Sequence, residues 1–198
     1  MTTSKGIPRT SRPPADELEV KARVEDPDAL RARLTRAGAE LEFRGDMIDR
    51  RFDRDERLAR RDEVLRLRVF QPGDGAPAYG VLGWKGPPSR RAGYRHRAEA
   101  EVRVTDPDAA VTILERVGFR VSLRIERRVE TYRLGGAVLR LEWYPAMDVL
   151  LEVEGEPPAI ERAIAATGLD RDTFVAESLP YFVAQYEART GRPALLAR

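Results

Sequence analysis

Charged side chains that could bind a metal ion and a phosphate group recur at a spacing of two residues along this chain. Glutamates form three such pairs and two arginines form another: Glu17 and Glu19, Glu99 and Glu101, Glu152 and Glu154, and Arg66 and Arg68. Carboxylate oxygens suit hard cations such as Mg²⁺ or Mn²⁺, whereas guanidinium groups make forked contacts with phosphate oxygens. A metal-bound polyphosphate needs both kinds of group, so the pattern predicts a site for such a ligand.

This spacing places the charges on one face of β-strands, because side chains alternate between the two faces of a strand. In the segment 16–24, the glutamates and Lys21 share one face, and Leu18, Val20 and Val24 share the other. Similar alternation in 63–70, 94–104 and 137–143 predicts further strands. A sheet with one solvated, ion-paired face would show the same pattern, each exposed pair being worth about 0–1 kcal/mol. Recurrence on five or more strands argues against that alternative.

An internal duplication indicates what covers the apolar face. Residues 19–38 and 99–118 match at a constant offset of eighty, and a weaker third unit begins near residue 150. In the first two units Asp26 and Asp106 are expected to cap helices whose first residues are Pro27 and Pro107. Helices with one narrow apolar stripe must pack on the apolar face of the sheet, which leaves the charged face uncovered.

We therefore predict an α+β fold, an eight-stranded antiparallel β-barrel or tunnel with a charged lumen and helices packed outside. Buried charges are tolerated only if ion pairing, water or a ligand satisfies them. The types of charged residue in the lumen should therefore be complementary to the ligand that binds there. The basic residues expected there are Lys21, Arg66, Arg68, Lys85, Arg95, Arg97, Arg127 and Arg140, and the acidic ones are Glu17, Glu19, Glu99, Glu101, Glu142, Glu152 and Glu154.

Composition restricts the partners and the compartment. The 198 residues predict one domain over 16–190, with a flexible arm at 1–15 and a short tail at 191–198. The 35 basic residues nearly cancel the 33 acidic ones, so we expect neither a nucleic-acid nor a membrane partner. Cysteine is absent and no apolar run approaches the roughly 20 residues of a membrane span, which favours a cytoplasmic protein. We expect a monomer or homodimer.

The lysines stand out against an arginine-rich background. The chain has 32 arginines and three lysines, and two of the lysines, Lys21 and Lys85, lie on strands among the expected lumen charges. An ammonium group can lose a proton near neutral pH, which a guanidinium group does not do. This favours a chemical role for them, although three residues are few enough for chance.

Taken together, these residues resemble the CYTH superfamily, the triphosphate tunnel metalloenzymes. The family signature Glu-x-Glu-x-Lys stands here as "ELEVK" at 17–21. It is followed in the family's order by the Arg-x-Arg pair at 66–68, "WKGP" at 84–87, "RAEAE" at 97–101, "RIERRVETY" at 124–132 and "LLEVE" at 150–154. The resemblance covers about residues 16–190.

The resemblance implies roles for these residues within a tunnel that binds a triphosphate and a divalent metal. By carry-over, the phosphate ligands are Arg66, Arg68, Lys85, Arg97, Arg127 and Arg140, and the metal ligands are Glu17, Glu19, Glu142, Glu152 and Glu154. Lys21 would position or deprotonate the nucleophile, and Glu99 and Glu101 would serve the metal, a base or substrate orientation. Two positions depart from the family: Val129 stands where a second basic residue is usual, and Glu142 where aspartate is common.

Three functions stay open at this point. The first is metal-dependent hydrolysis of the terminal phosphate of inorganic triphosphate, a nucleoside triphosphate or thiamine triphosphate. Chain length and the Asp-Pro junctions resemble class IV adenylate cyclase-like members, so the alternative is conversion of ATP to cyclic AMP and pyrophosphate. The third is a non-catalytic module that binds polyphosphate or nucleotide.

Overall fold

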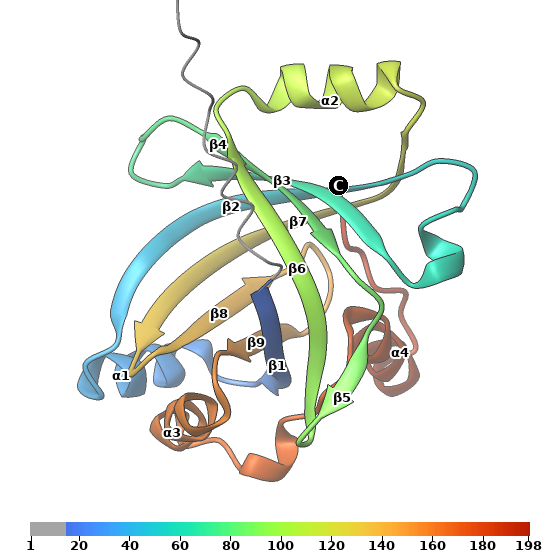
Figure 1. Ribbon diagram of the computed structural model, residues 1–198. Helices are drawn as coiled ribbons and strands as arrows, with labels where there is room; N and C mark the ends of the chain where they lie inside the picture. The colour runs from blue at the N-terminus through green and yellow to red at the C-terminus, as the bar shows by residue number, and fades with distance from the viewer. Residues whose placement is uncertain (1–14) are drawn as a thin grey trace, which may run out of the picture.

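One β-sheet that closes on itself dominates the computed structural model, which describes residues 15–198 (Figure 1). Its strands are β1 (Ala15–Val24), β2 (Glu40–Asp53), β3 (Val64–Pro72), β4 (Tyr79–Lys85), β5 (Ser89–Arg91), β6 (Tyr94–Val104), β7 (Arg120–Leu134), β8 (Ala137–Trp143) and β9 (Val149–Glu154). The expected arm at 1–15 falls almost entirely outside the described residues.

The strands form a closed antiparallel barrel. Their order is β1-β9-β8-β7-β2-β3-β4-β6, and pairing of β6 with β1 closes the ring, while short β5 adds to the outside of β6. Eight strands of the described chain therefore surround one lumen, and the predicted fold is confirmed. Because the ring is closed, each strand has hydrogen-bonded neighbours on both sides and its alternate side chains must point either inward or outward.

The helices pack on the outside of this barrel, as predicted. They are α1 (Pro27–Arg36), α2 (Pro107–Arg116), α3 (Pro157–Thr167) and α4 (Leu179–Thr190). Leu30 and Leu34 of α1 and Ile160 and Ile164 of α3 join the core formed by the outer side chains of β1, β8 and β9. Leu114 of α2 packs against outer residues of β2 and β3, on the opposite side of the molecule (Figure 1).

The duplicated units have the same local geometry. Asp26 Oδ1 accepts hydrogen bonds from the backbone N–H of Asp28 and Ala29, and Asp106 Oδ1 accepts one from Ala109. The backbone angles of the two caps agree within one degree, at φ −124°, ψ 89° and φ −125°, ψ 90°. None of the helices in the described part of the chain is both long and apolar enough to span a bilayer.

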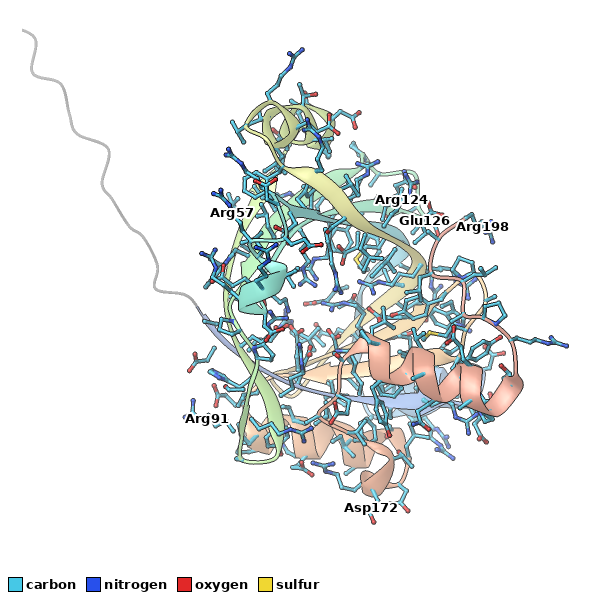
Figure 2. The ribbon with its side chains drawn as sticks, turned by 90° about the vertical axis from the view of Figure 1, so that its right-hand side faces the viewer. Arg57, Arg91, Arg124, Glu126, Asp172 and Arg198 are labelled. Atoms are coloured by element: carbon cyan, nitrogen blue, oxygen red, sulfur yellow. The ribbon has the colours of Figure 1, made fainter. Side chains whose placement is uncertain are left out.

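Helix α4 and the last residues pack near one end of the barrel. Leu179 and Phe182 of α4 contact Ile125 and Leu150, and Leu196 packs against the same cluster. The backbone N–H of Glu126 donates to the carbonyl of Leu196 at 2.6 Å. Figure 2 shows Arg124, Glu126 and Arg198 close together, where Glu126 pairs with Arg124 at 2.6 Å and accepts from the Arg198 backbone at 3.2 Å.

One buried carboxylate ties α1 to the outer face of the barrel. Glu130 on β7 is 2% exposed and accepts hydrogen bonds from Arg31 of α1 at 2.8 and 2.9 Å, Arg44 at 3.0 Å and the Tyr132 hydroxyl at 2.9 Å. Burial alone would raise the pKa of Glu130, but these donors and positive charges lower it below its ordinary value. The ionised form of Glu130 therefore stabilises the fold.

We expect Glu130→Gln to lower the free energy of unfolding at neutral pH by roughly 1–3 kcal/mol, because charge-assisted bonds are replaced by neutral ones. A depressed carboxyl pKa contributes stability above its ordinary value of 4.5, and this contribution disappears as the pH falls through the folded-state pKa. Between about pH 5 and pH 3 the wild type should thus lose stability more steeply than the variant. Urea titrations across this pH range measure the free energy of unfolding of both proteins, and exposed Glu40→Gln is the control. If wild type and Glu130→Gln lost stability equally with falling pH, ionised Glu130 would not stabilise the fold.

Arg97 anchors two connecting segments at one opening of the barrel. It is 6% exposed, and its Nε donates to the carbonyl of Gly86 at 2.5 Å, while another nitrogen donates to the carbonyl of Asp62. Gly86 follows β4, and Asp62 ends the segment that contains the short 3₁₀ helix η1 (Ala59–Arg61). One guanidinium group thus holds both segments against β6.

Loss of this anchor should loosen the η1 segment. We expect Arg97→Met to increase the rate of tryptic cleavage within 54–61 about tenfold or more, since each hydrogen bond to a charged donor contributes about 1.5–3 kcal/mol. Limited proteolysis followed by mass spectrometry measures this rate. Arg103→Met is the matched control, because Arg103 is an exposed arginine of the same strand that stacks on the ring of Tyr79. Equal cleavage of both variants would exclude an anchoring role for Arg97.

Candidate active site

A cavity of about 440 Å³ occupies the lumen and opens between the η1 segment, Pro88 and the start of α4. Nine of the fourteen site residues predicted from the sequence line it: Lys21, Arg66, Lys85, Arg97, Arg127, Arg140, Glu19, Glu142 and Glu152. The other five, Glu17, Arg68, Glu99, Glu101 and Glu154, lie on the same strands outside the cavity lining. The four glutamates pair with residues that line the cavity, and Arg68 pairs with Glu101, as described below. The closed barrel therefore brings the predicted acids and bases together around one lumen.

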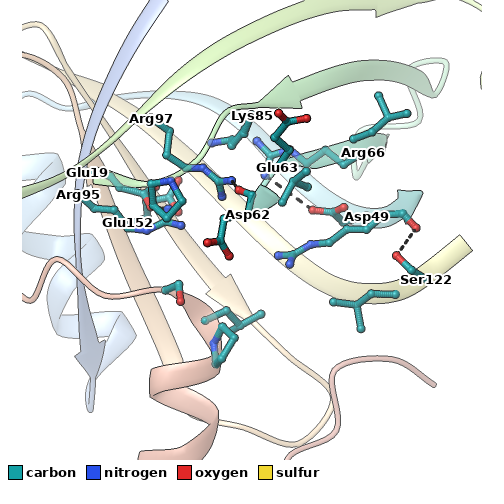
Figure 3. A pocket seen from close by; sticks show the side chains of 18 of the residues that line it. Glu19, Asp49, Asp62, Glu63, Arg66, Lys85, Arg95, Arg97, Ser122 and Glu152 are labelled. Carbon is teal, nitrogen blue, oxygen red and sulfur yellow. Dashed lines mark hydrogen bonds and ion pairs between the residues drawn. The ribbon is translucent and has the colours of Figure 1, made fainter. Parts of the chain in front are cut away.

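The wall formed by β1 and β9 carries the acidic cluster. Single carboxylate oxygens of Glu17, Glu19 and Glu152 all lie within 4.8 Å of one another. Lys21 pairs with Glu19 at 3.0 Å and with Glu152, which stands directly opposite it in the strand register. Figure 3 shows Glu19 and Glu152 close together, with Arg95, whose guanidinium pairs with Glu19 at 2.6 Å.

The lysine in this cluster is held as a cation. Burial alone would lower the pKa of Lys21, but the charges of Glu152 and Glu19 raise it above its ordinary value. For Glu152, burial acts to raise the pKa, and the charges of Lys21 and Arg140 outweigh it and hold the pKa well below the usual range. Both groups are consequently ionised at neutral pH in this arrangement.

The wall formed by β3, β4 and β6 carries a second set of pairs. Arg66 lies 3.3 Å from Glu99 and 3.6 Å from Glu101, and Arg68 also pairs with Glu101. Lys85 lies 3.3 Å from Glu99 and also pairs with Glu17, which links this wall to the acidic cluster. Gly83 faces these side chains. A Cβ there would lie 3.1 Å from the Glu101 carboxylate, so the absence of a side chain leaves room for the pairs.

The wall formed by β2, β7 and β8 contains groups that motif matching missed. Asp49 is 1% exposed, 3.5 Å from Arg127 and 3.9 Å from Arg66. Arg127 also pairs with Glu142 at 3.3 Å and donates to the Tyr144 hydroxyl at 3.2 Å, and this hydroxyl in turn donates to Glu142 at 2.6 Å. Glu142 is therefore engaged on this wall, apart from the three-carboxylate cluster.

Arg140 connects the remaining pair of acids. It pairs with Glu152 at 2.6 Å and lies 3.9 Å from Glu154. Burial and the neighbouring negative charges of Glu152 and Glu17 raise the pKa of Glu154 to about 7, against the opposing charge of Arg140. The two glutamates of this strand thus differ in charge near neutral pH, although they stand only two residues apart.

Several buried polar atoms of the lumen have no hydrogen-bond partner among the described residues. They are Oδ1 of Asp49 and Nε of Arg51, Arg66, Arg68, Arg127 and Arg140. Buried polar groups are normally satisfied, and arginine nitrogens that are left over suit phosphate or water oxygens. The donor set therefore fits an anionic, oxygen-rich ligand, and the three clustered carboxylates fit a hard divalent cation.

Val129 has an apolar role in the position where the family resemblance implied a base. It is fully buried and packs with Met47 and Phe70, against Phe43 and Val81. These side chains belong to β2, β3, β4 and β7, next to the charged residues of the same strands. A charge at position 129 would be buried in this apolar cluster, which explains why the site lacks a cation there.

Sequence reasoning missed Asp49, Arg51 and Tyr144, all of which line the cavity. Asp49 and Arg51 have the spacing of two that identified the other strands. The signal was obscured because Arg50, on the outer face between them, breaks the alternation of charged and apolar residues. Tyr144 follows directly after β8 and carried no signal of its own.

Comparison with solved structures shows that this barrel has been observed before. A proposed adenylate cyclase from Vibrio parahaemolyticus superposes with a TM-score of 0.70 at 21% identity, covering 85% of this chain and 97% of its own. The PH1012 protein from Pyrococcus horikoshii gives 0.66 at 20% identity, with 84% and 98% covered. A proposed adenylyl cyclase from Hippeastrum, described as having a dominant triphosphatase activity, gives 0.61 at 19% identity, with 92% and 99% covered. These likenesses establish a shared fold.

The family assignment comes from the sequence itself. A search of curated proteins finds no match to this chain. The family model for the CYTH domain matches residues 15–178, which span every barrel strand and end at the start of α4. Together with the closed eight-stranded barrel and its charged lumen, this match means that the chain belongs to the CYTH family.

Proposed function

We propose that this protein is a metal-dependent hydrolase that removes the terminal phosphate of a triphosphate substrate. One observation carries the proposal: arginine side chains that have unsatisfied nitrogens share the cavity with a cluster of three carboxylates, two of which, Glu19 and Glu152, line it. Phosphoryl transfer needs little covalent help from a protein and depends on positioning and on neutralisation of oxygen charge. A lumen lined by both signs of charge supports both requirements.

Glu17, Glu19 and Glu152 are the residues that would hold a divalent cation, Mg²⁺ or Mn²⁺. Their donor set consists only of carboxylate oxygens, which suits these hard ions. When bound, such a cation supplies neutralisation of the charge on phosphate oxygens. Lys21 and Lys85 neutralise these carboxylates in the ligand-free arrangement, a role that a bound cation would share.

The other charged residues would bind and orient the substrate. Arg66, Arg127 and Arg140 line the cavity and donate to phosphate oxygens in this proposal, while Arg68 supports Glu101 from outside it. Lys21 acts as a cation that positions the nucleophile, because its raised pKa opposes a role as a base. Glu99 and Glu101 orient Arg66 and Lys85 through ion pairs.

Hydrolysis is favoured over formation of cyclic AMP by the character of the cavity wall. The aromatic residues that line the cavity are Phe52 and Tyr144, 2% and 8% exposed, and the Tyr144 hydroxyl is hydrogen-bonded to Glu142. Among the described residues, the cavity therefore offers no exposed ring on which an adenine base could stack. The triphosphatase activity described for the Hippeastrum protein of the same fold agrees with this preference.

Metal binding can be tested without any turnover. We expect Glu19→Gln to weaken binding of Mn²⁺ at least tenfold, because loss of one carboxylate ligand removes both a charge and a donor oxygen. Isothermal titration with Mn²⁺ alone measures the affinity. Exposed Glu25→Gln, just past the end of β1, is the control and should bind as the wild type does. Unaltered Mn²⁺ affinity in Glu19→Gln would remove this residue from the metal site.

The reaction is identified by its products. Purified protein incubated with Mg²⁺ or Mn²⁺ should release orthophosphate from inorganic triphosphate, ATP or thiamine triphosphate, and EDTA should abolish this release. Glu19→Ala should abolish metal-dependent turnover, whereas Glu25→Ala should retain it. Cyclic AMP plus pyrophosphate from ATP would instead select the cyclase, and tight binding of all three compounds without products would select a non-catalytic module.

A further inference from the structure

One cation of the cavity differs from all the others in its surroundings. Arg51 lies on β2, shares the inward face with Asp49 and lines the cavity. Among residues 15–198 its side chain makes neither an ion pair nor a hydrogen bond, and its Nε is buried without a partner. Its backbone pairs with the neighbouring strands β3 and β7, and its carbonyl also accepts from the Ser122 hydroxyl at 3.3 Å. The sequence motifs assign it no role.

Every other basic side chain that lines the cavity is already engaged. Lys21, Arg66, Lys85, Arg95, Arg127 and Arg140 each pair with at least one carboxylate, and Arg97 donates to two backbone carbonyls. An arginine ordinarily recovers part of its desolvation cost through such partners. Arg51 is thus a cationic hydrogen-bond donor in the cavity for which the described residues provide neither a carboxylate nor another acceptor.

The electrostatic surroundings of Arg51 favour an anion. Burial lowers its pKa; Asp49 opposes this effect, and the positive charges of Arg66 and Arg127 add to it. Like charges at close range are destabilising unless an anion lies between them. Asp49 lies within 4 Å of Arg66 and Arg127 and forms no ion pair with Arg51. Arg66 and Arg127 have further carboxylate partners in Glu99 and Glu142, whereas Arg51 has none among residues 15–198.

The barrel places Arg51 opposite the acidic cluster. In the closed ring, β2 is the fourth strand from β1 in either direction, so the two strands face each other across the lumen. Figure 3 agrees: Glu19 and Glu152 lie on one side of the cavity, and Asp49 and Ser122 lie on the other. A linear ligand that reaches from the carboxylate cluster across the cavity ends at the wall that carries Arg51.

We propose that Arg51 is a further substrate-binding residue, which donates through its guanidinium to a phosphate group of the substrate on the wall opposite the carboxylate cluster. The proposal rests on the proposed function and adds to it a direction for the phosphate chain, one end toward Glu17, Glu19 and Glu152 and the other toward Arg51, Arg66 and Arg127. The forked guanidinium suits the two oxygens of a phosphate group. Arg51 binds substrate and takes no proton.

The test combines anion affinity with stability. Titration of inorganic triphosphate in EDTA should show binding to Arg51→Ala weakened about tenfold or more, because a charge-assisted hydrogen bond is lost. Arg51→Lys should weaken binding less, since it keeps the charge but lacks the forked geometry. The melting temperature of ligand-free Arg51→Ala should equal or exceed that of the wild type, because an unpaired charge beside two like charges is removed.

Arg50→Ala is the matched control, since Arg50 is the outward-facing neighbour on the same strand, and its triphosphate affinity should be that of the wild type. Triphosphate affinity of Arg51→Ala within twofold of the wild type would overturn the proposal. So would a lower melting temperature shared by Arg51→Ala and Arg51→Lys, which would assign Arg51 a structural role.

Two further outcomes separate this proposal from the proposed function. If the wild type binds triphosphate but releases no product, the proposed hydrolase fails while Arg51 keeps its role. If turnover occurs and Arg51→Ala leaves KM unchanged, Arg51 alone is excluded.

Discussion

Cancellation of charge across neighbouring strands is the condition on which this barrel depends. The lumen holds many charged side chains, and each one that was buried without a partner would cost several kcal/mol. The strand register places opposite charges side by side: Lys21 faces Glu152, which also faces Arg140, and Glu19 faces Arg95. A slip of one residue would turn every charge toward the helices and every leucine inward, so the pairs and the apolar outer core enforce the same register.

The same pairs keep the cavity ready for a ligand. The lysines and most arginines are held by carboxylates in the ligand-free state, yet several of their nitrogens have no partner among residues 15–198. A phosphate chain and a cation can therefore enter by exchange of partners, which costs less than the exposure of bare charges. Such incomplete satisfaction lowers stability and is typical of functional sites, where binding energy makes up the difference.

Some charged residues of the lumen are engaged by the protein itself. Arg97 donates to the carbonyls of Gly86 and Asp62 and so shapes the opening, while Arg68 is paired with Glu101 outside the cavity lining. Val129 extends an apolar cluster next to the charged part of the lumen. The helices contribute from outside, since α1, α2 and α3 cover the leucines and valines whose burial leaves only the inward face for charge.

The sequence alone determined three features through its alternation of charged and apolar residues and its internal repeat. These are a barrel with charges inside and apolar residues outside, the duplicated strand and helix units, and most of the charged residues that meet in the lumen. The sequence could do so because the side-chain period of a strand is two and because apolar helix stripes need an apolar sheet face. Only the tertiary structure decided which charges pair, because partners such as Lys85 and Glu17 are distant in sequence and meet through ring closure. It also revealed Asp49, Tyr144 and the unpaired Arg51, since exposure and partnership depend on every strand of the ring and leave no trace in local spacing.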